Sequence, residues 1–302
     1  MACIRWLSRN EIDNQLWDIT IKNSRYPCIY ATVKWLDHFS PAWQALVWED
    51  YEAVMPVTAK QQLTVPYLAQ PAFTQQLGLF SSREADAQIT GAFIAALQKK
   101  YAFAEIRVNR SFRDVPGVKE RKNHILNLNM PYPDIVEHYS KSLKQNIHKA
   151  ETSSLVYKKT NDFDLAISSF KELHAAKVNL KQADYIALKK AAESFSEKGN
   201  CFVSEIRDHS GSLLSIGLFF IAMKRIYKLI TATFPEGRVA GAHHFMIDEL
   251  VKEYAGTDML LDFEGSSIPG IAAFNTSFGA VPEVYYFLKW NHLKWPLKML
   301  KK

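Results

Sequence analysis

The sequence predicts an α+β fold of two domains, each built on a mostly antiparallel mixed sheet flanked by helices. A chain of 302 residues exceeds the usual size of one hydrophobic core. Helical and strand periodicities alternate along it, and helices followed by a strand meander occur once in each half. Pro131 and Pro133 mark the junction. We therefore expect domains at residues 1–133 and 134–302.

Composition restricts the class of protein. The chain is 48% hydrophobic and 23% charged, which is ordinary for a globular protein and excludes general disorder. Its net charge of +6 favours an anionic partner such as a phosphorylated metabolite, RNA or an acidic membrane, unless the charge only solvates the surface. Cys3, Cys28 and Cys201 form no C-x-x-C pair, so we expect reduced thiols and a cytoplasmic protein. The opening residues lack a signal-peptide core.

The first half begins with two helices, at residues 10–22 and 29–39, which show apolar positions at helical spacing. Apolar strands at 43–48 and 53–57 then flank a charged turn and predict a hairpin. An amphipathic helix at 84–100 leads into a strand at 101–108. We expect that strand to pair with residues 124–130. This half carries no glycine-rich phosphate loop. We therefore expect it to shape the binding site of an acceptor substrate and not to hold a phosphate-containing donor.

Residues 65–78 break the periodicity with prolines, glutamines and aromatic residues. Polar loops of this length within compact domains are often functional. Gln75 and Gln76 are therefore predicted to line a substrate groove. The alternative is a surface loop that is packed by its own aromatic side chains.

The second half starts with a helix at residues 135–150, whose Lys144 and Lys149 are candidates for contact with phosphates. A solvated basic face is the alternative. The expected elements that follow are a short strand, two helices and three strands, at residues 155–158, 164–177, 183–198, 201–207, 213–223 and 227–234. The run at 213–223 is apolar but too short to span a bilayer.

The chain is organised around the strand at 227–234 and the helix that ends near Tyr254. A strand that leads through a small-residue loop into a helix directs backbone N–H groups and the positive helix end at one point, which suits an anion. The alternative is that Gly237 and Gly241 only make turns. The predicted donor-binding residues are Arg238, Val239, Ala240, Gly241, Ala242 and His243.

A short strand at 259–263 then leads into a polar D-F-E-G-S loop. Asp262 and Glu264 lie two residues apart, on one face of an extended chain, and close carboxylates raise one another's pKa. They are the predicted catalytic carboxylates, although Asp262 could instead cap a turn. Tyr285 could supply a phenolic hydroxyl, with core packing as the alternative. Ser266 and Asn275 are predicted to contact substrate.

These segments carry a resemblance to known families. The pattern Arg238-x-x-Gly241-x-His243 resembles the pyrophosphate loop R/Q-x-x-G-x-G/A of the GNAT acyltransferase superfamily, with histidine as a departure at the last position. A longer match, over most of residues 140–288, is similar to the Fem-type (FemABX) peptidyltransferases, which have two GNAT-like domains. The matching segments are L-D-F-E-G at 261–265, G-I-A-A-F at 270–274, F-G at 278–279 and the basic helix at 143–150.

The resemblance implies a transferase that moves an acyl or aminoacyl group to an amine. For a Fem-like enzyme it implies an aminoacyl-tRNA donor, an amine acceptor in the inter-domain cleft and a role in cell wall biogenesis. For an ordinary GNAT enzyme it implies acyl-CoA and N-acetylation. Either donor would be a co-substrate and not a tightly bound cofactor. The remaining alternative is a non-catalytic protein that binds RNA or another ligand.

Two further features bear on partners. Adjacent helical residues His243 and His244 point about 100° apart and have no evident third ligand, so no metal is expected. The tail at 289–302 mixes five lysines with Trp290 and Trp295. Such a tail could contact an anionic membrane or pack on the domain by its tryptophans. The expected location is therefore cytoplasmic, with a membrane-peripheral protein as the alternative.

Overall fold

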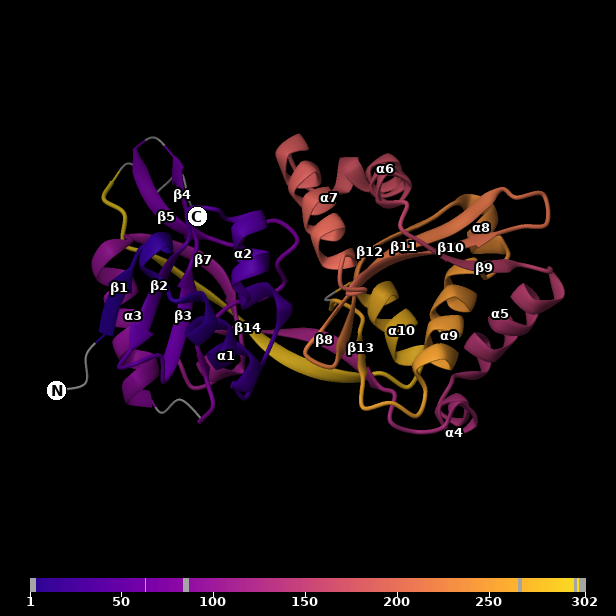
Figure 1. The fold of residues 1–302 in the computed structure, drawn as a ribbon, viewed down its shortest axis with the longest axis horizontal. Coiled ribbons are helices and arrows are strands. Elements are labelled where there is room, and N and C mark those ends of the chain that lie inside the picture. Colours follow the sequence, from indigo (N-terminus) through magenta and orange to yellow (C-terminus); the bar gives the residue numbers. More distant parts are fainter. Residues whose placement is uncertain (1–3, 63, 84–86, 266–267, 296–297, 299–302) are drawn as a thin grey trace. The chain divides into compact units, whose positions relative to one another are not determined.

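The computed structural model describes residues 4–62, 64–83, 87–265, 268–295 and 298, and the chain forms two compact units (Figure 1). Unit 1 comprises Met1–Arg121 and Val284–Lys302, and unit 2 comprises Lys122–Glu283. The chain enters unit 2 within strand β8 (Lys119–Asn127) and leaves it within β14 (Val281–Asn291). The boundary expected at residue 133 therefore falls inside unit 2, and the last strand belongs mostly to unit 1.

The described residues of unit 1 form two groups of strands and three α-helices. The antiparallel order β1-β2-β3-β6 is formed by Ile4–Leu7, Gln44–Trp48, Ala53–Val57 and Phe80–Ser81. The order β4-β5-β7-β14 is formed by Ala59–Gln62, Val65–Ala69, Phe103–Val108 and β14. The helices are α1 (Asn14–Asn23), α2 (Val33–Phe39) and α3 (Ala87–Lys100). Single 3-10 turns lie at Arg9–Glu11, Ile29–Ala31 and Arg110–Phe112.

The predicted hairpin of unit 1 is confirmed, because β2 and β3 pair in antiparallel register. Two other predictions for this unit are wrong. Residues 65–69 are not loop but strand β5, which pairs with β4 and β7, so neighbouring strands override the unfavourable Pro66. Strand β7 does not pair with β8. It lies between β5 and β14, a partner about 180 residues distant that local sequence does not reveal.

Unit 2 is built on a sheet with the order β8-β13-β12-β11-β10-β9. Only the β12–β13 pair is parallel. Its strands after β8 are β9 (Val156–Thr160), β10 (Cys201–Arg207), β11 (Leu213–Ala222), β12 (Arg225–Thr233) and β13 (Leu260–Asp262). Its helices are α4 (Tyr132–Glu137), α5 (Lys141–Thr152), α6 (Phe163–His174), α7 (Gln182–Ser196), α8 (Pro235–Val239), α9 (Ala242–Tyr254) and α10 (Pro269–Ser277), with a 3-10 turn at Ala175–Lys177.

Helices cover both faces of this sheet (Figure 1). Neighbouring residues of β11 show this, because side chains alternate along a strand. Phe219 packs in the core that α5 and α9 share with the sheet, whereas the ring of Phe220 meets Phe195 of α7 at 5.4 Å. The predicted α+β class, with mostly antiparallel mixed sheets flanked by helices, is confirmed.

Two local predictions for unit 2 need correction. The helix expected at 135–150 is two helices, because the Ser140 hydroxyl accepts a hydrogen bond from the Leu143 N–H and starts α5 anew. The loop expected between the strand at 227–234 and the helix that ends near Tyr254 contains a further helix, α8, which Pro235 opens. No helix within the described part of the chain combines the length and apolar character that a bilayer span requires.

Candidate functional site

The candidate site lies where β12 and β13 separate. These parallel strands pair only from Arg225 to Tyr227, because β13 ends at Asp262 while β12 continues to Thr233 beside β11. The β13-facing edge of β12 is therefore open beyond Tyr227. Side chains reach two backbone positions there: Arg238 Nε donates to the Thr233 carbonyl at 3.2 Å, and the His174 ring bonds to the Thr231 backbone.

The chain then turns from α8 into α9 through Gly241. This residue has a φ of +73°, and a Cβ here would lie 2.7 Å from the Asn146 carbonyl oxygen of α5. Both facts require glycine. The N–H groups of Arg238, Ala240 and Gly241 already donate to backbone carbonyls. No side chain caps α9, so the N–H donors directed outward are those of its own first turn.

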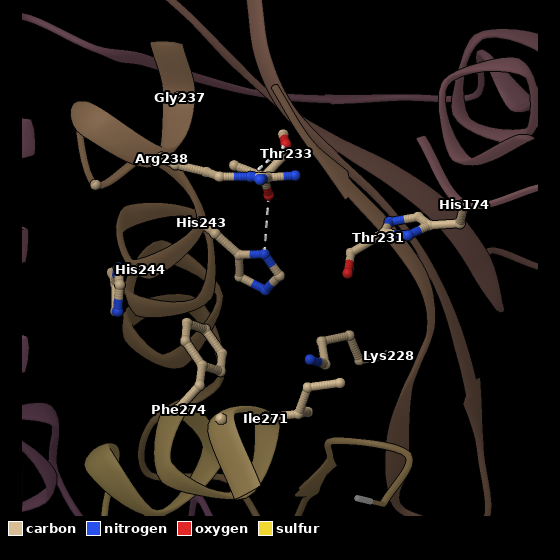
Figure 2. Close-up of a pocket in the computed structure, with 12 residues that line it drawn as sticks. His174, Lys228, Thr231, Thr233, Gly237, Arg238, His243, His244, Ile271 and Phe274 are labelled. Atoms are coloured by element: carbon tan, nitrogen blue, oxygen red, sulfur yellow. Dashed lines mark hydrogen bonds between the residues drawn. The ribbon is translucent and has the colours of Figure 1, made fainter. Parts of the chain in front are cut away.

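These elements enclose a cavity of about 390 Å³ (Figure 2). Helix α10 closes it opposite β12. The twelve described residues that line it are His174, Lys228, Thr231, Thr233, Gly237, Arg238, Gly241, His243, His244, Gly270, Ile271 and Phe274. Five of these twelve are basic or can become so, and none is acidic. Such a lining suits an anionic ligand.

His243 extends into this cavity, whereas His244 lies on another side of α9 (Figure 2). The Nδ1 atom of His243 is 3.1 Å from the Thr233 hydroxyl, and its ring meets Phe274 edge-on at 4.6 Å. Its Nε2 atom is buried without a hydrogen-bond partner among the described residues. Burial, helped by the charge of Lys228, lowers the pKa of His243 well below its ordinary value. A neutral imidazole thus presents a free nitrogen to the cavity.

Lys228 faces His243 from β12 (Figure 2). The side chain is only 8% exposed, and its ammonium lies 5.3 Å from the ring centres of both Phe263 and Phe274. None of the described residues gives it a hydrogen bond or an ion pair. Burial lowers its pKa to about 8, and the charge of Asp262 opposes this shift. Lysine is seldom buried without a partner, so this cation is unusual.

Asp262 does not line the cavity. Its Oδ2 accepts from Arg225 at 2.8 Å, and its Oδ1 accepts from Asn123 at 2.9 Å and from the Glu264 N–H at 2.8 Å. Arg225 also binds Glu283, at 2.8 and 2.9 Å. Burial raises the pKa of Asp262, and the Arg225 charge acts against it. The carboxylate is therefore enclosed in a network that its neighbours complete, and its catalytic role stays a prediction.

Glu264 does not line the cavity either. It adopts a left-handed conformation with a φ of 61°, and its Oε1 is buried without a partner in the described part of the protein. Burial raises the pKa of this carboxyl well above its ordinary value, which favours the neutral form of the group. Hence the two carboxyls that the sequence pairs lie in different surroundings: Asp262 forms an ion pair, whereas Glu264 has a buried oxygen without a hydrogen-bond partner among the described residues.

The other predicted residues are dispersed. Tyr285, Gln75 and Gln76 belong to unit 1, where Tyr285 and Gln75 are buried. Lys144 and Lys149 lie on the exposed side of α5, outside the cavity lining.

The remaining predicted residues lie nearer the cavity. Asn275 follows the lining residue Phe274 on α10 and is fully buried, with neither amide atom bonded. Val239 is 71% exposed, whereas Ala242 is buried. Ser266 lies outside the described residues. The structure therefore brings only Arg238, Gly241 and His243 of the predicted set into the cavity lining.

Sequence reasoning missed Lys228 and the residues that accompany it. One signal was available: a lysine stands inside the otherwise apolar strand sequence Y-K-L-I-T-A-T-F.

The described residues contain no group of three or more His, Cys, Asp or Glu side chains that could hold a metal ion. In the C-terminal tail, Trp290 is buried and bonds the Tyr101 carbonyl, whereas Trp295 is 82% exposed.

Neither a protein family nor a curated protein matches the chain by sequence. Solved structures do share its fold. A crystal structure of FemX superposes with a TM-score of 0.67 at 12% identity, over 96% of this chain and 98% of that chain. A conserved protein from Bacteroides thetaiotaomicron gives 0.62 at 13% identity, over 95% and 99%. The C-terminal domain of a putative lysylphosphatidylglycerol synthetase from Agrobacterium fabrum gives 0.58 at 11%, over 92% and 93%. The fold is therefore Fem-type and GNAT-like.

Proposed function

We propose that this chain is an acyl- or aminoacyltransferase of the GNAT type, which holds its donor in the cavity between β12, α9 and α10. The observation that carries the proposal is the lining of that cavity, which has basic side chains and no acidic one among the described residues. Both candidate donors, acyl-CoA and aminoacyl-tRNA, carry phosphates. Arg238 and the uncapped start of α9 are the groups that would bind them.

The open edge of β12 supports a donor that lies along the strand. Thr231 and Thr233 direct polar backbone groups to that edge, where an extended polar arm could bond in place of the His174 and Arg238 side chains that contact these groups. The carbonyl carbon of the donor would then lie deeper, towards Lys228 and His243. Their cationic and imidazole nitrogens are suited to stabilise the oxyanion that forms when an amine attacks.

The reaction balances without a further reagent. The amine nitrogen forms a bond to the carbonyl carbon, and the C–S bond of a thioester or the C–O bond of an ester breaks. The proton that the amine releases ends on the leaving thiolate or alkoxide. An ester or thioester donor therefore provides both the acyl group and the proton acceptor, and the cavity needs only to bind, orient and stabilise charge.

A non-catalytic ligand-binding protein is the second candidate. It is favoured by one observation: the carboxylates predicted to serve as bases do not line the cavity. The two candidates agree on the ligand and differ on the product. Transfer of a labelled acyl group to a panel of amines, in the presence of saturating donor, separates them.

Calorimetric titration with CoA and with an aminoacylated acceptor-stem RNA tests the donor. We expect one of them to bind, and Arg238→Ala to weaken that binding severalfold and to reduce its salt dependence. Arg113→Ala is the matched control, since Arg113 is exposed and belongs to unit 1. Binding that is unchanged by Arg238→Ala, or absent for both ligands, would contradict the proposal.

A further inference from the structure

Lys228 is a buried cation without a counter-charge among the described residues. Its ammonium contacts two neutral rings, Phe263 and Phe274, and it neither donates a hydrogen bond to, nor forms an ion pair with, any residue that the structure describes. The nearest acidic influence is Asp262, whose two oxygens are already bound by Arg225, Asn123 and the Glu264 N–H. A desolvated charge without a partner is costly, so such a group commonly receives its partner from a ligand.

The position of Lys228 fixes which part of the ligand meets it. Arg238 lies at the other end of the same strand region, since its Nε bonds the Thr233 carbonyl. Residues 228 and 233 of an extended strand are roughly 15 Å apart. A donor whose phosphates bind at Arg238 and at the start of α9 therefore brings its far end, the acyl group, to Lys228.

The residues around Lys228 restrict the charge that the acyl group of the donor can carry. His243 faces Lys228 and is neutral, and the described lining offers no acid that could bind a positive group. An aminoacyl group carries an ammonium, which Lys228 would repel. A carboxylate would instead form a charge-assisted hydrogen bond in a site from which water is largely excluded.

Resting on the proposed function, we propose that Lys228 is a specificity-determining residue that binds a carboxylate on the acyl group of the donor. The transferred group is then an anionic acyl group of the malonyl type, and an aminoacyl group is disfavoured. His243 Nε2, which is also without a partner, is available to bond the second carboxylate oxygen or the thioester oxygen.

Calorimetric titration of the chain with malonyl-CoA, propionyl-CoA and glycyl-CoA tests the inference, because one CH2 beyond the thioester carbonyl these acyl groups carry a carboxylate, a methyl group and an ammonium. We expect malonyl-CoA to bind about tenfold or more tightly than propionyl-CoA, and glycyl-CoA to bind most weakly. Lys228→Met should remove the preference for malonyl-CoA. Lys224→Met, which changes an exposed lysine paired with Asp258, should preserve it.

Two results would overturn the inference: malonyl- and propionyl-CoA binding the unaltered chain within threefold of one another, or the preference surviving in Lys228→Met. Failure of every CoA compound to bind would contradict a CoA donor and would leave the role of Lys228 to a second measurement. Millimolar malonate, with acetamide as a neutral control at matched ionic strength, should raise the Tm of the unaltered chain and not that of Lys228→Met. Equal shifts in both proteins would refute the assignment.

Discussion

Arg225 and Lys228 lie three residues apart on β12, and both cations are largely removed from solvent, with the Arg225 side chain 14% exposed and Lys228 8% exposed, yet their surroundings differ. Arg225 meets Asp262 and Glu283 at 2.8–2.9 Å, and Asn123 bonds the same two carboxylates. We call these four residues the Arg225 network. Lys228 has no acidic partner among the described residues and faces a cavity. The protein itself completes the first arrangement, and the second requires a ligand.

The difference indicates that β12 has a structural role at Arg225 and a binding role at Lys228. A network whose charged groups are all paired holds strands together and excludes solvent. A cavity with a free cation and a free imidazole nitrogen retains unsatisfied groups, which is typical of a binding site. If Asp262 were the catalytic base, the reaction would take place at the Arg225 network. The residues that line the cavity make Lys228 and His243 the alternative candidates for contact with the reacting groups.

Arg225→Met has the largest expected effect. Loss of the guanidinium leaves the carboxylates of Asp262 and Glu283 without a cation, so we expect the free energy of unfolding to fall by about 3–5 kcal/mol. Urea unfolding at pH 7 measures this change. Lys224→Met is the matched control, because Lys224 and Asp258 form an exposed pair between the same two strand regions. That control should change stability by less than about 1 kcal/mol. Equal losses in both variants would refute the comparison.

Lys228→Met tests the other half of the comparison through pH. Burial lowers the pKa of Lys228 from 10.5 to about 8, so between these values the unfolded chain holds a proton that the folded chain has released. Stability should therefore rise with pH in this window, by about 3 kcal/mol in total for this group. Below pH 8 both states are protonated and the group adds no slope.

The measurement is urea unfolding of both proteins from pH 7 to 10. Asp262 and His243 are the titratable groups that influence Lys228, and both remain in the variant. We expect the unaltered chain to gain stability relative to Lys228→Met as pH rises through this range. At pH 7 the variant should be at least as stable, because it removes an unpaired buried charge. Parallel pH curves for the two proteins would mean that Lys228 is not a desolvated cation.

His243→Leu has the smallest expected effect on folding. The substitution removes one hydrogen bond, between Nδ1 and the Thr233 hydroxyl, which corresponds to about 1 kcal/mol of unfolding free energy. Donor binding should weaken more than stability does, since Nε2 is free to meet a ligand. His209→Leu is the control, because His209 is exposed on the turn between β10 and β11, outside the cavity lining. Titration calorimetry and urea unfolding of both variants give the comparison, and equal donor affinity in the two would contradict it.

Local pattern was sufficient for some elements and insufficient for others. The helix near residues 245–254 and the strands at 201–233 follow from apolar spacing, and the structure contains α9 and β10 to β12 there. The pairing of β7 with β14 could not be predicted, because its partner lies about 180 residues away. Residues 65–69 form a strand only because β4 and β7 supply hydrogen bonds on both sides.

The residues of the candidate site could likewise be predicted only in part from the sequence. Arg238, Gly241 and His243 were found because a small-residue loop before a helix is visible in the sequence. Glu264 and Asp262 were paired on the assumption of a continuous extended chain. The left-handed backbone at Glu264 ends that alternation and separates their environments.

The order of helices and strands of an α+β fold, and the small-residue loop before α9, could be recognised from the sequence. These features depend on residues close together in the chain. The three-dimensional fold was needed to show that Arg225 is paired, while Lys228 has no acidic partner among the described residues. Whether a buried charge finds a partner depends on β8, β13 and β14, which approach β12 from distant parts of the sequence.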